Sequence, residues 1–235
     1  MKTPRTVFLG LLISLPIFGA ALLPRYWAPF ARQSIFAKGI EAYGMVVLLS
    51  VIAMVIFGQG RWNEFGFQKS TGSWWKFILY ALLIGAISTL AVKFSPGKGM
   101  EGGLKDVKPI QLLLLVIIGS AAEELFFRGW LQGFLWPLQT RLVKLGSVAI
   151  SVPVLTGALA FGAMHLPKGI SIDLWTTVIL VVFTTSLGLL AGIIRERTGS
   201  LLPSIATHLA GNAGGVLGGL VYLLVRKAQG IPMPI

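Results

Sequence analysis

The sequence has few of the residues that a water-exposed surface and most catalytic centres need. It contains no cysteine, which excludes disulfide bonds, thiolate nucleophiles and cysteine-ligated metal sites. Charged residues make up only 12% of the 235 residues, whereas a soluble domain typically has about 25%. There are eight acids and two histidines in all. Chemistry based on carboxylates or imidazoles must therefore come from a very small set of side chains.

Most of the remaining residues are apolar. Hydrophobic residues make up 55% of the chain, and the mean hydropathy is +0.82. We therefore expect an integral, multi-pass membrane protein, an all-α transmembrane helix bundle with one membrane-embedded domain over residues 1–235. The predicted spans are seven apolar segments, at 7–23, 40–57, 77–92, 110–127, 148–165, 174–194 and 201–225.

Three further features concern the membrane interface. The amphipathic segment 130–145 either lies at the interface or forms an eighth, broken helix. The N-terminus, with its basic start and long apolar run, predicts an uncleaved first helix, with a cleavable signal peptide as the alternative. The tryptophans expected in the aromatic belt at the head groups are Trp74, Trp75, Trp130 and Trp136.

The formal net charge of +12 does not indicate nucleic acid as a partner. The basic residues are scattered through short loops, and no basic patch with interleaved aromatics is present. Charges placed in this way anchor loops near anionic lipid head groups, so we expect membrane lipids as partners. Basic residues are divided almost equally between the two sides of the predicted bundle, which leaves its orientation open.

Two carboxylates and a guanidinium follow the apolar run of the fourth span, in the sequence EELFFR. Each charge costs roughly 2.5 to 3.5 kcal/mol at the bilayer centre, so we expect these groups to pair and to face inward. Glu124 and Arg128 are four residues apart on one helix face and predict an ion pair. Glu123 lies about 100° around the helix and remains as a spare carboxylate. The alternative is a purely structural cluster at the helix end.

Both histidines also fall in predicted spans. His165 ends the sequence FGAMH, and His208 and Asn212 lie one turn apart in HLAGN. Taken alone, a histidine at a helix end such as His165 is more typical of an interfacial hydrogen bond than of catalysis. His208 and Asn212, taken alone, are typical of an interhelical hydrogen bond. Glycines at four-residue spacing then predict close packing of the last helix on a neighbour, with its polar groups at the contact: Gly211, Gly215 and Gly219, and also Gly214 and Gly218.

If the three spans converge, they form a site with a carboxylate, two imidazoles and an amide. A water held between Glu123 and His165 can then be deprotonated and attack a peptide carbonyl. His208 and Asn212 can donate hydrogen bonds to the developing oxyanion. This chemistry is that of a peptide hydrolase without a covalent intermediate.

The three motifs, in this order, resemble those of the CPBP family of intramembrane endopeptidases, also called the Abi family, which includes CAAX proteases and bacteriocin-processing or self-immunity proteins. The family pattern is E-E-x-x-x-R, F-x-x-x-H and H-x-x-x-N or H-x-x-x-B, and EELFFR, FGAMH and HLAGN fill every position. The matching core covers about 110–225, whereas residues 1–109 carry no family signature. The G-x-S-G motif of rhomboid serine proteases is absent.

The resemblance implies a membrane-embedded glutamic-type endopeptidase. It makes Glu123 the carboxylate that activates water and His165 its partner in proton transfer. His208 and Asn212 become the pair that stabilises the transition state. Glu124 and Arg128 become the supporting ion pair.

The resemblance further implies a peptide or protein substrate, lipidated or otherwise membrane-anchored, no cofactor and no nucleic acid, in a prokaryotic cell membrane. Two alternatives stay open at this point. One is a zinc-dependent protease in which Glu123, His165 and His208 ligate the metal. The other is a binding or immunity scaffold that has the site without turnover.

Overall fold

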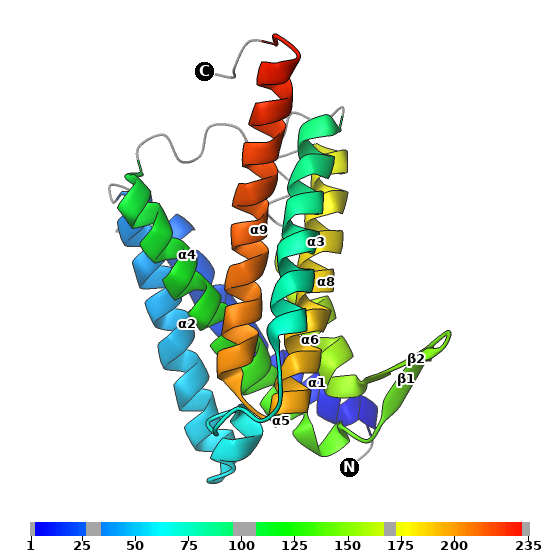
Figure 1. The fold of residues 1–235 in the computed structure, drawn as a ribbon. Helices are drawn as coiled ribbons and strands as arrows, with labels where there is room; N and C mark the ends of the chain where they lie inside the picture. The colour runs from blue at the N-terminus through cyan, green and yellow to red at the C-terminus, as the bar shows by residue number, and fades with distance from the viewer. Residues whose placement is uncertain (1–2, 27–33, 96–106, 167–172, 232–235) are drawn as a thin grey trace.

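The computed structural model describes residues 3–26, 34–95, 107–166 and 173–231, which fold into a helical bundle (Figure 1). Within these ranges, seven helices exceed ten residues: α1 (Thr3–Tyr26), α2 (Ile35–Gly58), α3 (Trp75–Phe94), α4 (Pro109–Glu124), α6 (Val152–Ala163), α8 (Leu174–Thr198) and α9 (Leu201–Ala228). The predicted all-α membrane bundle is confirmed, since each of the seven predicted spans overlaps one of these helices.

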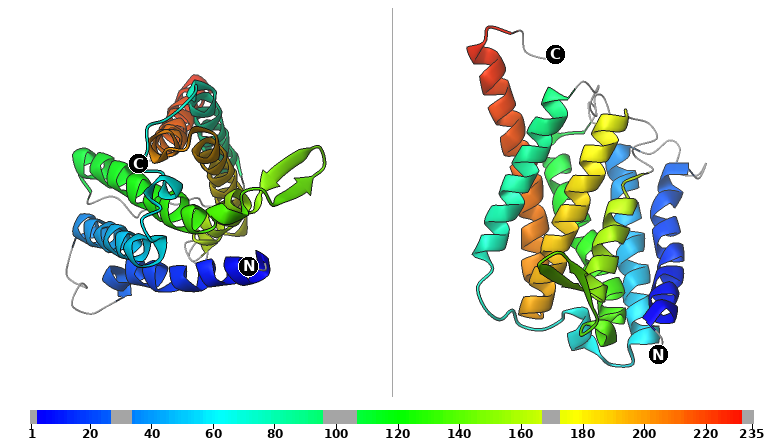
Figure 2. Two further views of the ribbon diagram at one scale, coloured as in Figure 1. Left: turned by 90° about the horizontal axis from the view of Figure 1, so that it is seen from below. Right: turned by 90° about the vertical axis from the view of Figure 1, so that its right-hand side faces the viewer.

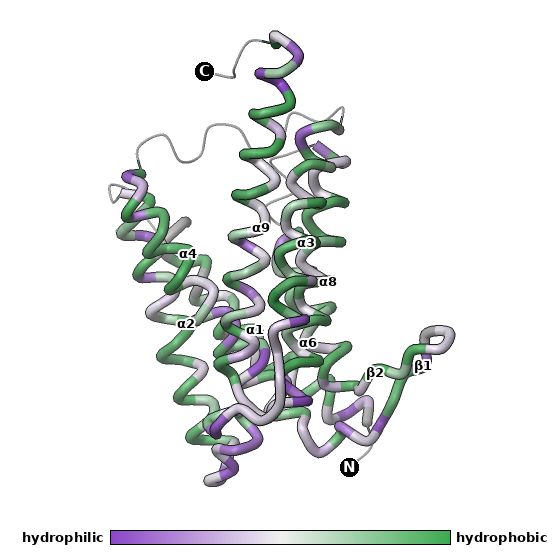
Figure 3. The backbone as a smooth tube through the Cα atoms, in the orientation of Figure 1, coloured by the Kyte–Doolittle hydropathy of each residue, from purple (hydrophilic) through white to green (hydrophobic). Residues whose placement is uncertain are grey.

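Five helices of the described residues are long and apolar enough to cross a membrane. They are α2, α3, α8, α9 and the continuous helix Pro109–Phe134. Two further apolar helices, Pro4–Ala20 within α1 and Val152–Ala163, are shorter. The outer faces of the long helices are mostly apolar (Figure 3), as expected where side chains contact lipid rather than water.

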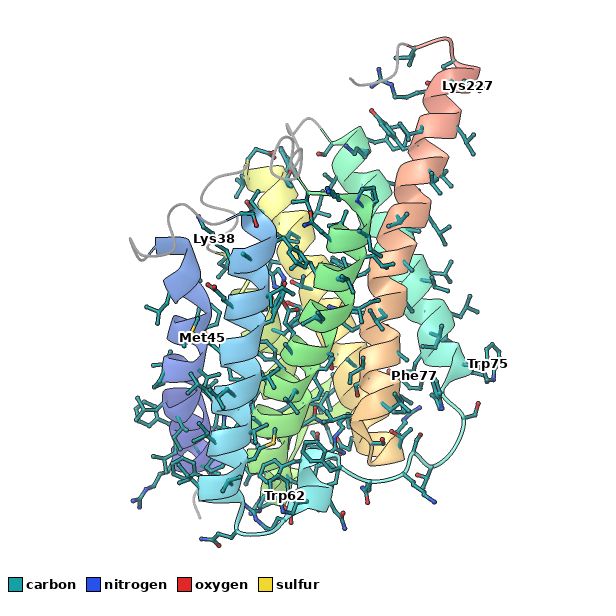
Figure 4. All side chains as sticks on the ribbon, turned by 90° about the vertical axis from the view of Figure 1, so that its left-hand side faces the viewer. Lys38, Met45, Trp62, Trp75, Phe77 and Lys227 are labelled. Atoms are coloured by element: carbon teal, nitrogen blue, oxygen red, sulfur yellow. The ribbon has the colours of Figure 1, made fainter. Side chains whose placement is uncertain are left out.

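The helices form two groups that meet where α4 contacts α9. Helices α3, α8 and α9 pack together on one side, whereas α1 packs on α2 and α2 packs on α4 on the other (Figure 2). Contacts between α4 and α9 join the two groups. The helices run from one end of the bundle to the other. Lys38 and Lys227 lie toward one end, and Trp62 lies at the other (Figure 4).

The fourth span is longer than predicted. Helix α4 continues without a break into the π-helix η3 (Leu125–Leu131) and the short α5 (Gln132–Phe134). A 3-10 turn, η4 (Trp136–Leu138), then leads into strand β1 (Leu142–Leu145). The alternative of an eighth, broken helix over 130–145 is therefore wrong, because the first part of this segment extends the fourth span and its last part is a strand.

A small hairpin corrects the predicted fifth span. Strand β1 pairs antiparallel with β2 (Val148–Ser151) and projects from the side of the bundle (Figure 1). Ser151 then caps α6 by accepting a hydrogen bond from the Val154 N–H, and Pro153 lies in the first helical turn. The span predicted from residue 148 therefore begins four residues later, where the cap and proline start the helix.

Trp130 is another correction. It is fully buried rather than at the interface. Its indole Nε1 donates to Ser14 Oγ of α1 at 3.1 Å, and its ring stacks on Phe65. A buried tryptophan needs an acceptor for its N–H, and α1 supplies one here.

The glycines of α9 bring this helix close to α3, as predicted. A Cβ on Gly214 or Gly218 would meet the backbone of α3, at the carbonyl oxygens of Leu82 and Ala86. The polar residues of α9, however, are not at this contact. They face α4 on a different side of the helix, so that part of the prediction is wrong.

Candidate active site

The site is organised around Glu124, which is completely buried. Its Oε1 accepts hydrogen bonds from Arg128 Nη1 at 3.0 Å and from His208 Nδ1 at 2.9 Å. A carboxylate only accepts hydrogen bonds, so His208 Nδ1 carries a proton in this contact. The expected Glu124–Arg128 ion pair is therefore present, and the same carboxylate also orients an imidazole.

Arg128 connects this ion pair to a second helix. Its Nη2 donates to the carbonyl oxygen of Gly188 in α8 at 2.9 Å, and its guanidinium lies over the Phe161 ring at 4.8 Å. One turn further along, Gln132 Nε2 donates to the carbonyl oxygen of Gly192 at 3.0 Å. The π-helix that carries Arg128 and the start of α5 are thus fixed to α8 by two contacts of the same kind. π-helical turns of this sort occur frequently at functional sites.

Glu123 has a different environment from its neighbour. Its side chain is 17% exposed and faces a cavity, and His208 Nε2 lies 3.8 Å from its Oε2. Arg128 makes its ion pair with Glu124 instead. Two adjacent carboxylates therefore differ sharply: one is buried and held by two donors, and the other faces open space.

His165 lies just beyond the end of α6. Its Nδ1 donates to the carbonyl oxygen of Phe161 at 2.9 Å, since a carbonyl only accepts. The Phe161 ring makes edge contacts with both histidines, with centroids 5.1 Å from His165 and 5.4 Å from His208. Phe161 therefore separates and orients the two imidazoles.

Asn212 completes the wall formed by α9. Its Nδ2 donates to Ser120 Oγ of α4 at 3.0 Å. Ser120 and Glu124 are one turn apart on α4, and they contact Asn212 and His208, which are one turn apart on α9. The order of the two pairs is reversed, as it must be for antiparallel helices. This matching fixes the register of α4 against α9.

These side chains surround one cavity of about 470 Å³. Glu123, His165, His208 and Asn212 all line it, while Glu124 and Arg128 lie behind its wall. The three polar motifs therefore converge, from the fourth span, the end of α6 and α9. An ionisable group, two imidazoles and an amide around one space can support proton transfer and stabilise a developing negative charge.

Residues 106–214, a little under half of the chain, match the family model described as type II CAAX prenyl endopeptidase Rce1-like. Residues 106–214 belong to the CPBP family of CAAX-type proteases. The chain is therefore a membrane-embedded peptidase whose substrates are peptides or proteins at the membrane. No curated protein and no solved structure matches the chain.

The zinc-dependent alternative requires Glu123, His165 and His208 as ligands. In the part of the chain that the structure describes, no three His, Asp or Glu side chains are grouped closely enough to hold a metal ion. His208 Nδ1 is bound to Glu124, and His165 Nδ1 is bound to a backbone carbonyl. The predicted ligand set Glu123, His165 and His208 lines the cavity of the protease without forming such a cluster.

The sequence alone assigned no role to three side chains of the protease site. Ser120 holds Asn212, Phe161 contacts both histidines, and Tyr43 of α2 lines the cavity. Ser120 had a usable signal, since it lies one turn before Glu124 and so mirrors the His208–Asn212 spacing. Tyr43 had none, because only the tertiary fold brings α2 to this wall.

Proposed function

We propose that this protease hydrolyses a peptide bond with a water molecule that Glu123 deprotonates, without a covalent enzyme intermediate. The observation that carries the proposal is the contrast between the two carboxylates. Glu124 is buried and held by Arg128 and His208, whereas Glu123 faces the cavity. A general base must be able to reach its water, and Glu123 meets that requirement better than Glu124.

The proposed reaction has two steps. Glu123 takes one proton from a water in the cavity, and the water oxygen attacks the scissile carbonyl carbon, whose oxygen becomes an oxyanion. Asn212 donates a hydrogen bond to that oxyanion, and so does His208 as an imidazolium, from Nε2–H while its Nδ1–H stays bound to Glu124. His165 then relays the proton to the leaving nitrogen, the C–N bond breaks, and a carboxylic acid and an amine are released.

The supporting groups act by orientation. Glu124 holds the proton of His208 on Nδ1 and aims Nε2 toward Glu123 and the cavity. Ser120 accepts one amide N–H of Asn212, which fixes the amide plane and leaves its second N–H for substrate. Arg128 balances the buried charge of Glu124. The reaction in this form needs no metal ion.

We further propose that the substrates are lipidated or membrane-anchored chains, since the cavity lies within apolar helices. A prokaryotic cell membrane is the expected location. The test uses membranes that contain wild type or Glu123→Ala, incubated with a farnesylated CAAX peptide, the same peptide without lipid, and a peptide with one membrane span. Mass spectrometry measures the released fragments.

Wild type is expected to release a fragment from at least one peptide, and Glu123→Ala to release none above background. The matched control is Glu64→Ala, which removes a carboxylate paired with Arg61 far from the cavity and should keep wild-type activity. Equal release by wild type and Glu123→Ala would refute the catalytic assignment. No release from any peptide by wild type would favour a binding or immunity scaffold.

A further inference from the structure

A tyrosine outside the family-matched residues faces the same cavity. Tyr43 lies on α2, whereas the family match covers residues 106–214. It lines the cavity together with Glu123, His165 and His208. Much of the remaining wall is apolar, from leucine, valine and phenylalanine side chains. A phenol at this position adds one hydroxyl to the polar side chains of the cavity.

Gly119 of α4 allows Tyr43 to come this close. A Cβ added at Gly119 would lie only 2.6 Å from Tyr43 Cζ and 2.7 Å from its hydroxyl oxygen. Any other residue at position 119 would have to displace the end of the phenol ring. The hydroxyl of Tyr43 therefore occupies the space that the missing side chain leaves on α4.

The same spot lies next to the proposed general base. Gly119 and Glu123 are four residues apart, on one face of α4. Side chains of an α-helix lean toward its N-terminus, so the Glu123 side chain leans over the turn that contains Gly119. The Glu123 carboxylate also acts electrostatically on the Tyr43 hydroxyl.

Both groups have unused hydrogen-bonding capacity. Among the described residues, no protein atom forms a hydrogen bond with the Tyr43 hydroxyl or the Glu123 carboxylate within 3.5 Å. A phenol can donate one hydrogen bond and accept another, while a carboxylate can only accept. A water between them can donate one proton to Glu123 and its other proton to Tyr43.

We propose that Tyr43 is a positioning residue that holds the attacking water and the Glu123 carboxylate in their reactive arrangement. In that arrangement, though not in the structure itself, its hydroxyl donates to a carboxylate oxygen of Glu123 and accepts the second hydrogen of the water. Both lone pairs of the water oxygen stay free, and one of them points toward the scissile carbonyl. This inference rests on the proposed function, because it gives Tyr43 a role only if Glu123 activates water.

The test measures kcat and KM of purified protein in lipid nanodiscs, with the peptide of the panel above that wild type cleaves fastest. Tyr43→Phe keeps the ring and removes only the hydroxyl. It is expected to lower kcat about 10-fold to 100-fold, the range for one lost hydrogen bond to a charged group, with KM unchanged. Tyr80→Phe is the matched control, since Tyr80 is 48% exposed on α3, and it should leave both constants unchanged.

A second variant tests the contact with Gly119. Gly119→Ala should push the Tyr43 hydroxyl away and lower kcat to a similar extent. In the Tyr43→Phe background, the same substitution should cause no further loss of kcat, because the hydroxyl is already absent. Thermal unfolding of each variant shows whether a loss of kcat comes from loss of folded protein.

Three results would overturn the inference: a Tyr43→Phe variant with wild-type kcat, a rise in KM at constant kcat, or equal losses from Gly119→Ala in both backgrounds. Glu123→Gln in the same assay separates this inference from the proposed function. If Glu123→Gln is inactive while Tyr43→Phe is fully active, only the role of Tyr43 fails. If Glu123→Gln is active, both fail.

Discussion

Arg128 shows how much of the site depends on the shape of one side chain. Its guanidinium donates from Nη1 to Glu124 and from Nη2 to the carbonyl oxygen of Gly188, so it joins two helices. A lysine has a single nitrogen on a flexible stem and cannot reproduce this fork. The residue therefore sets both the charge balance and the geometry behind the cavity.

We predict that Arg128→Lys lowers both the unfolding midpoint and kcat. Arg128→Ala should lower the free energy of unfolding by about 3–5 kcal/mol, because it leaves the Glu124 charge buried and unpaired. Thermal unfolding in detergent and peptide turnover check this. Arg197→Lys is the control, since Arg197 is exposed near the end of α8 and should tolerate the change. An Arg128→Lys variant with wild-type stability and turnover would show that the fork is dispensable.

Single residues were predictable from the sequence where a local spacing determined their contacts. The Glu124–Arg128 pair follows from a separation of one helical turn. Ser120 and Tyr43 are in the site because α9 and α2 pack against α4, and no local pattern states which helices are neighbours. Trp130 was misplaced for the same reason: its burial depends on Ser14, more than one hundred residues away in the chain.

At the scale of the helices, apolar length predicted the spans but not where each one starts. The segment 148–165 has the same apolar composition throughout, and a short apolar run fits a strand and a helix equally well. Ser151 and Pro153 are a capping residue and a first-turn proline, and they were the local signals that divide it. The extension of the fourth span through a π-helix had no sequence signal that we recognise.

The packing of α9 on α3 gives a prediction for two glycines. A Cβ on Gly214 would collide with the backbone of α3 at Leu82, whereas a Cβ on Gly219 would meet nothing within 4 Å. Alanine is favoured over glycine in a helix by about 1 kcal/mol. Gly214→Ala should therefore lower the unfolding midpoint in detergent, and Gly219→Ala should leave it unchanged or raise it. Equal midpoints for the two variants would contradict the close approach of the helices.

At the scale of the whole molecule, three distant parts of an apolar chain supply the polar groups of one cavity. Residues near 123, 165 and 208 are brought together by the contacts of α4 with α9 and of α6 with α8. The sequence indicated which residues would converge, since few polar groups were available. The shape of the cavity could not be predicted from the sequence. Nor could the acceptors of His208 and Asn212, because both depend on how the helices pack.

Metal dependence is a property of the whole assembled site. We predict that the purified protease keeps its turnover after incubation with a zinc chelator, because the described His, Asp and Glu residues form no ligand cluster. The measurement is kcat before and after chelation, together with the zinc content of the protein. Activity that disappears with the chelator and returns with added zinc would establish the metal-dependent alternative.

The most direct test of the central claim compares the two neighbouring carboxylates in purified protein. Glu123→Gln should lower kcat by about 10²-fold to 10⁴-fold, as expected for loss of a general base, with the unfolding midpoint unchanged. Glu124→Gln should instead lower the midpoint, because Glu124 holds Arg128 and His208 in the buried interior. A Glu123→Gln variant that cleaves peptide at the wild-type rate would contradict the account.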